Sequence, residues 1–226
     1  MKINKKTFDI LKNFSGIRSS IHVEQGNIIR TVSTAKNIMA EAKVDEDFVK
    51  PFAIFDLGKF IATTSLFGNP EYQFNDKFVS IKSDNGSSVN YFYADEKLVE
   101  KATKTIKMPS ITVKFSLSAN QIMEIQKASS VLQLDTVCIR NSDSNTIEIV
   151  TFDRKVGLNS SSNSFTMALA DSTTNKFNIF IDMDLLKMLP DDYSFEIGGT
   201  AVAKLVGAKT GVTYWIALRA ESNTKV

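Results

Sequence analysis

The sequence predicts an α+β fold that occurs twice, each copy having two helices packed on antiparallel sheet. The first observation is that the same order of predicted elements occurs twice, at a separation of roughly 114 to 126 positions. This order is a helix, a short strand, an apolar strand that leads into a second helix, and an aromatic closing strand. The second is that the closing strands, 90–94 and 213–217, are aromatic and alternating. A repeated order at a near-constant separation indicates a duplicated domain.

The 226 residues suffice for two domains of about 110 residues, each with its own core. A hydrophobic content of 43% and a charged content of 23% are typical of globular proteins. We expect a first domain at 1–108, ending in a linker at about 95–108, and a second at 109–226. Lysines without clear periodicity occupy the linker, and Pro109 favours extended backbone at Met108.

The first half begins with a helix from an Asn4 N-cap through Phe14, ended by Gly16. A turn at Gln25-Gly26-Asn27 is expected to join the first two strands, and Asp84-Asn85-Gly86 a later hairpin. The predicted strands are 20–24, 28–33, 39–44, 52–56, 72–74, 78–82 and 89–94, with a second helix at 57–67. The acidic triplet 45–47 is interpreted as charge that offsets the basic start of the chain.

The second half begins with a capping box, Ser118 with Gln121, and a helix to about Leu132. A short helix at 182–189 is expected to stop at Pro190, and the polar stretch 157–164 to form a loop. The predicted strands are 136–140, 146–152, 164–171, 177–181, 193–197, 201–206 and 212–220.

The residues offer no catalytic constellation, so we expect no enzyme, no cofactor and no metal site. The one histidine, His22, lies in an apolar strand, and the one cysteine, Cys138, is expected to be a buried structural thiol. No phosphate-binding glycine motif occurs. Acidic pairs at 182/184 and 191/192 raise a magnesium site as an alternative, but Asp182 and Asp184 open a predicted helix, where carboxylates suit the N-terminal dipole. Without an apolar leader or a long apolar run, an intracellular protein is expected.

Two features point to binding, each with a structural alternative. Lysines on predicted helix faces, Lys5, Lys12, Lys59, Lys127 and Lys187, would neutralise phosphates, or they are simply solvated. The only tryptophan, Trp215, falls on the polar face of the last strand. Its ring is then either a partner contact or covered by the linker.

The chain resembles the DNA polymerase sliding clamps of T-even-type bacteriophages from Leu11 to Ala220. The segments that carry the resemblance are 11–14, 52–57, 130–136, 177–181 and 214–218. The resemblance implies a head-to-tail homotrimer whose six similar domains form a ring around double-stranded DNA, bound without regard to sequence. Edge strands 89–94 and 164–171 would join subunits through Tyr91, Phe92, Phe165 and Met167.

The resemblance also assigns the remaining sites. Lys5, Lys12, Lys127 and Lys187 would face DNA, although Ser130 stands where the family has a second basic residue. Ile106, Met108, Pro109 and Trp215 would form a groove for peptides of the viral DNA polymerase. Further implied partners are a clamp-loader ATPase and late-transcription factors, in the cytoplasm of the infected bacterial host. The alternative is a duplicated structural or assembly protein of a virus with no role in DNA sliding.

Overall fold

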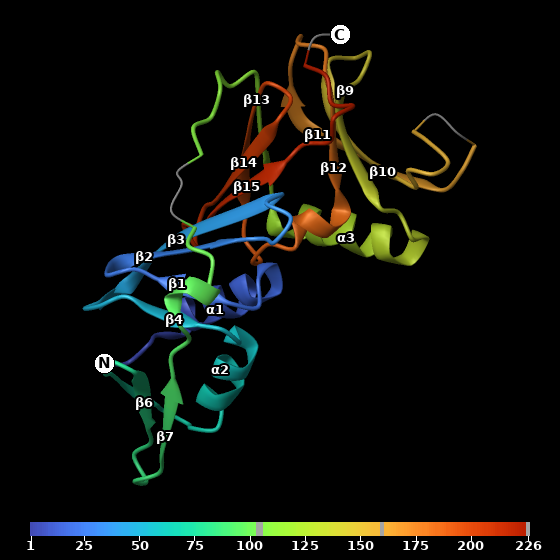
Figure 1. Ribbon diagram of the computed structural model, residues 1–226. Coiled ribbons are helices and arrows are strands. Elements are labelled where there is room, and N and C mark those ends of the chain that lie inside the picture. Colours follow the sequence, from blue (N-terminus) through green and yellow to red (C-terminus); the bar gives the residue numbers. More distant parts are fainter. Residues whose placement is uncertain (103–105, 159–160, 225–226) are drawn as a thin grey trace. The chain divides into compact units, whose positions relative to one another are not determined.

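The computed structural model describes residues 1–102, 106–158 and 161–224. The chain divides into two compact units, Met1–Lys104 and Thr105–Val226 (Figure 1). The predicted boundary between residues 108 and 109 falls close to this division. The predicted linker and the predicted loop at 157–164 include residues 103–105 and 159–160, which lie outside the described residues. In each unit helices pack on antiparallel sheet, which confirms the α+β class.

Helix α1 (Lys5–Ile17) begins at the predicted N-cap, because the Asn4 side chain accepts a hydrogen bond from the Thr7 N–H. Its buried face, Thr7, Ile10, Leu11 and Phe14, lies on the side that packs against α2 and β3. The predicted stop at Gly16 is wrong. The helix continues to Ile17 and ends where Arg18 turns to extended backbone and donates its N–H to the Phe14 carbonyl.

A buried carboxylate holds the first turn of α1 on strand β3 (Ile38–Phe48). Glu46 is 7% exposed and accepts hydrogen bonds from the Asn4 N–H (2.6 Å) and the Thr7 hydroxyl (2.5 Å). The strand was expected to end at residue 44 and the acidic triplet to be surface charge. The inward alternation instead continues through Glu46 to Phe48, so this carboxylate is structural.

The remaining elements of the first unit are β1 (Ile21–Val23), β2 (Gly26–Val32), β4 (Phe52–Ile54), α2 (Leu57–Thr64), β5 (Glu71–Phe74), β6 (Phe78–Lys82), β7 (Ser88–Phe92) and a 3-10 turn at Glu96–Leu98. Their pairings are β1 with β4, β2 with β3, and β5-β6-β7, all antiparallel. The prediction that a turn joins the first two strands as a hairpin is therefore wrong, because β1 pairs with β4 and β2 pairs with β3. Gly26 (φ +111°) already begins β2, which pairs onward with β3.

The second unit contains β8 (Val113–Leu117), α3 (Ala119–Leu132), β9 (Thr136–Asn141), β10 (Thr146–Phe152), β11 (Ser164–Ser172), β12 (Asn178–Asp182), β13 (Tyr193–Gly198), β14 (Val202–Gly207) and β15 (Thr213–Ala217). Strand order is β11-β10-β9-β12 in one sheet and β15-β14-β13-β8 in the other. The capping box of α3 is confirmed, and α3 packs against β10 and β11. The helix predicted at 182–189 is only a 3-10 turn, Met183–Leu186, because few residues separate β12 from Pro190.

Candidate functional site

Helix α1 carries three of the five lysines on helices α1, α2 and α3, and two of them lie on one exposed stripe. Lys5, Asp9 and Lys12 lie one above the other on successive turns. The Lys5 side chain is 87% exposed and forms an ion pair with Asp9 (2.5 Å). Lys12 is exposed and has no ion-pair partner among the described residues, and the exposed Lys6 lies beside the stripe. This surface therefore suits weak contacts with a polyanion.

Helix α3 presents a different surface. Its exposed face carries one base, Lys127, and one acid, Glu124, together with Met123 (59% exposed) and Val131 (73% exposed). Ser130 is exposed as well, so the face has no excess charge. Lys187 is the C-cap residue of the 3-10 turn Met183–Leu186, which follows β12, and it forms an ion pair with Asp184 (2.8 Å). The predicted DNA-facing lysines are therefore all exposed, but those of the first unit stand in the more positive surroundings.

Strands β7 and β11 each lie at the edge of a sheet. On β7, Phe92 is 66% exposed, whereas Tyr91 packs edge-on against Phe60 (5.3 Å) and donates its hydroxyl hydrogen to the Asp56 carbonyl (3.0 Å). On β11, Phe165 and Met167 are half-buried. Both strands thus combine a backbone edge with partly exposed apolar side chains.

Trp215, predicted on the polar face of the last strand as either a partner contact or a ring covered by the linker, is buried in the structure. Trp215 is 6% exposed, because β15 is buried on both faces: Tyr214, Trp215 and Ile216 are all buried. Its Nε1 has no hydrogen-bond partner among the described residues. A buried donor without a partner loses its hydration at a cost of about 1–3 kcal/mol.

The segment around Pro109 lies against the end of this sheet. A Cβ on Gly198 would come within 2.7 Å of the Pro109 carbonyl oxygen, so only glycine permits this approach. Gly198 pairs with Val202, and Val202 pairs with Ala217, so Gly198 lies two strands across the sheet from β15, near the end of the strand that carries Trp215. Ile106 and Met108, which precede Pro109, are half-buried.

Asp191 fixes the turn that leads into β15. It is 3% exposed and accepts hydrogen bonds from the backbone N–H groups of Lys209 (3.0 Å) and Thr210 (2.7 Å) and from the Thr210 hydroxyl (2.7 Å). Burial opposes ionisation of this carboxyl, but the hydrogen bonds outweigh it and keep the pKa of Asp191 below its ordinary value. The carboxylate thus helps to position the strand that carries Trp215.

We expect Asp191→Asn to lower the unfolding free energy by about 2 kcal/mol near pH 7, since part of the carboxylate's hydrogen bonding is lost. Because the folded pKa is depressed, Asp191 stabilises the protein above its unfolded pKa of about 3.9, and this contribution is lost as pH falls through the folded pKa. Urea titrations at about pH 7 and about pH 3 should therefore show that acid lowers the unfolding free energy less in the variant than in the unmodified chain. An equal decrease of the unfolding free energy in acid for the variant and the unmodified chain would contradict this role. Asp143→Asn, at an exposed position, is the control.

In the described part of the chain, His22 and Cys138 are both buried. Among the described residues no group of three or more His, Cys, Asp or Glu side chains is placed to hold a metal ion. The His22 side chain is 3% exposed, with Nε2 3.3 Å from Glu96, and burial raises the pKa of the Cys138 thiol to about 12. Within the described ranges, no helix combines the length and apolarity needed to span a membrane.

Comparison with known proteins identifies the family. The sliding clamp of Escherichia phage RB69 is 30% identical over 227 residues, covering 98% of this chain and 98% of that protein. The chain belongs to the sliding-clamp family. The sliding clamp of Vibrio phage KVP40 is 28% identical, in an alignment that covers 97% of this chain and 100% of that protein. The protein-family model for the C-terminal domain of the gp45 sliding clamp matches residues 114–220 of this clamp.

Solved structures give the same fold. The proliferating cellular nuclear antigen of Entamoeba histolytica superposes with a TM-score of 0.71 at 12% identity, covering 96% of this clamp and 97% of that chain. The A. fulgidus antigen, bound to the C-terminal region of FEN-1, gives 0.68 at 16% identity, with 96% of each chain covered. This protein is thus a DNA sliding clamp, a processivity factor and not an enzyme, and a purely structural viral role is not favoured.

Proposed function

We propose that three copies of this clamp close head to tail into a ring that encircles duplex DNA, slides along it and tethers the viral replicative polymerase. The observation that carries the proposal is the match to phage sliding clamps along nearly the whole chain, in two compact units. A head-to-tail interface closes into a ring when the rotation between subunits permits. A tethered polymerase gains a high effective concentration at the primer end.

In this ring, β7 of one copy pairs with β11 of the next. Tyr91 and Phe92 lie on one side of the interface, and Phe165 and Met167 on the other. The support is that both strands end their sheets and carry partly exposed apolar side chains. Backbone pairing supplies register, and the apolar side chains supply buried area.

DNA lies against the helices in this proposal, with Lys5, Lys12, Lys127 and Lys187 contacting phosphates. Exposed ion contacts contribute about 1 kcal/mol or less each, so they attract the duplex without fixing the ring to one position. The first unit supplies more of this attraction, because α1 and α2 carry four lysines and one acid, whereas α3 carries one of each.

A groove formed by Ile106, Met108, Pro109 and Trp215 holds a short polymerase peptide. Two observations support it. The buried Trp215 Nε1–H would donate a hydrogen bond to an incoming carbonyl oxygen. A structure of the same fold binds the C-terminal region of another protein. The Trp215 ring then forms a wall of the groove and not a protruding anchor.

The proposal extends to the other partners. A clamp-loader ATPase opens the ring in the cytoplasm of the infected bacterial host, and late-transcription factors use the same groove. The support is that the sequence relatives are phage clamps and that this sequence has no nucleotide-binding motif. ATP must therefore be bound by another protein.

Retention on DNA with blocked ends tests encirclement without a loader. The clamp is threaded onto linear duplexes fixed at one end to a bead, and streptavidin then blocks the other end. A ring stays on the blocked duplex in high salt and leaves as soon as a restriction enzyme frees an end. Release in high salt while both ends are blocked would overturn the proposal, because it indicates side-on binding.

A further inference from the structure

The two sheets that carry the proposed subunit contacts each have a second edge, and unpaired edges invite association. In one sheet the edges are β5 and β7; in the other they are β11 and β12. Subunit pairing in the proposed ring uses β7 and β11. The question is what prevents β5 and β12 from pairing in their place.

The segment that follows β15 covers β12. Asn223 and Asn178 exchange both backbone hydrogen bonds (2.7 and 2.8 Å). The Arg219 N–H donates to the Phe180 carbonyl (2.9 Å), and the Phe180 N–H donates to the Ser222 hydroxyl (2.9 Å). Outward groups on an antiparallel edge come from alternate residues. Residues 219–223 therefore satisfy the outward N–H and carbonyl groups of both Asn178 and Phe180.

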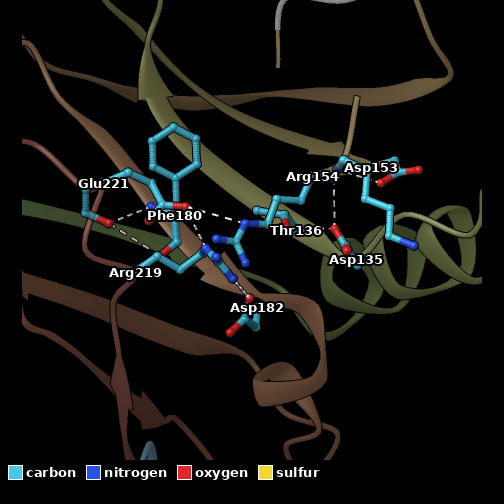
Figure 2. Close-up of polar contacts among 10 residues, drawn as sticks. Asp135, Thr136, Asp153, Arg154, Phe180, Asp182, Arg219 and Glu221 are labelled. Carbon is cyan, nitrogen blue, oxygen red and sulfur yellow. Dashed lines mark hydrogen bonds and ion pairs between the residues drawn. The ribbon is translucent and has the colours of Figure 1, made fainter. Parts of the chain in front are cut away.

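Side chains fasten this segment at its start (Figure 2). The Arg219 guanidinium is 13% exposed and bonds to both Asp182, at the end of β12, and Glu221 (2.8 Å). Arg154 adds a longer ion pair with Glu221 (3.9 Å). The cover is thus held at one end by Arg219 and at the other by the Asn223 backbone.

The edge of β5 is covered similarly. The Met1 nitrogen donates to the Tyr72 carbonyl (2.9 Å), and the Tyr72 N–H donates to the Met1 carbonyl (2.8 Å). By contrast, β7 and β11 have no strand on their outer side in the described chain. They are also almost uncharged, with Asp171 the one charged residue on the two strands.

We infer that Met1 and residues 219–223 select the subunit contact by covering β5 and β12, so that β7 of one copy meets only β11 of another. The partner at each open edge is a second copy of this chain. This inference rests on the proposed ring. Uncovering β12 would open the second edge of the sheet that contains β11, and contacts through it need not close, so assembly would continue beyond three chains.

The test compares three variants by sedimentation velocity over a concentration series, with far-UV circular dichroism as the check on folding. One variant lacks residues 219–226. Asn223→Pro removes the N–H that bonds to Asn178, and Asn223→Ala keeps it. We expect the deletion and the proline variant to form species heavier than three chains, growing with concentration, while the alanine variant matches the unmodified chain.

A folded deletion variant and a folded proline variant that both sediment like the unmodified chain would overturn the inference. If the deletion does not fold, the proline and alanine pair decides. The failure of the proposed ring looks different, because the unmodified chain would then not form trimers. Heavier species that appear only on uncovering β12 would still support the edge cover in that case.

Discussion

Replacing Phe92 by glutamate is expected to abolish the trimer at concentrations where the unmodified clamp is fully assembled. Phe92 is 66% exposed on the β7 edge, and in the ring its side chain would be buried against the neighbouring subunit. An unpaired carboxylate buried there costs about 3 kcal/mol, roughly a hundredfold per interface. Sedimentation equilibrium measures the change directly, and end-blocked DNA should retain almost none of the variant.

Two controls separate this effect from misfolding. Val49→Glu places the same charge on another exposed apolar residue of the first unit (72% exposed) and should leave the trimer unchanged. Phe92→Leu keeps apolar area but loses the ring contact with Phe78 (5.4 Å), so only modest weakening is expected. A folded Phe92→Glu trimer of normal stability would remove β7 from the interface.

Reversing the basic stripe of α1, with Lys5→Glu and Lys12→Glu together, is expected to slow threading onto DNA about 10- to 100-fold at low salt. The proposed ring contains three copies, so the two substitutions change its charge by −12, and electrostatic steering of association changes accordingly. The rate at which labelled clamp enters a duplex with one free end is the measurement. Retention after blocking should not change, since it depends on topology and not on charge.

The matched control is Lys77→Glu with Lys82→Glu. Both lysines are exposed in the same unit, Lys82 at the end of β6 and Lys77 in the bend before it, and they change the net charge equally. If the two pairs of substitutions slow threading equally, only the total charge matters and α1 does not face DNA. Normal threading of the Lys5→Glu and Lys12→Glu variant would contradict the proposal that α1 faces DNA even more directly than equal slowing by both pairs.

Local signals in the sequence predicted the elements whose determinants are also local. Asn4 and the Ser118–Gln121 pair cap α1 and α3 as expected, since an N-cap needs only residues within one turn. Strand β8 was missed, although Val113, Phe115 and Leu117 alternate with polar residues. The run is only five residues long and stands close to the predicted linker, so its periodicity is a weak signal.

The errors at the candidate sites concern partners distant in sequence. Glu46 was interpreted as surface charge, because its donors, Asn4 and Thr7, lie about 40 residues earlier. Trp215 was assigned to the polar face of its strand, because alternation distinguishes two faces without revealing whether both are buried. Likewise, a turn signal near Gly26 could not tell that β1 pairs with β4. Tertiary pairing decides such cases.

The mass of the unmodified clamp in solution is the most direct test of the ring. Sedimentation velocity across the micromolar range should detect one assembled species of three 25.1 kDa chains, about 75 kDa, in exchange with monomer at the lowest concentrations. Dimers that do not progress to trimers, or a monomer at every concentration, would contradict head-to-tail closure through β7 and β11.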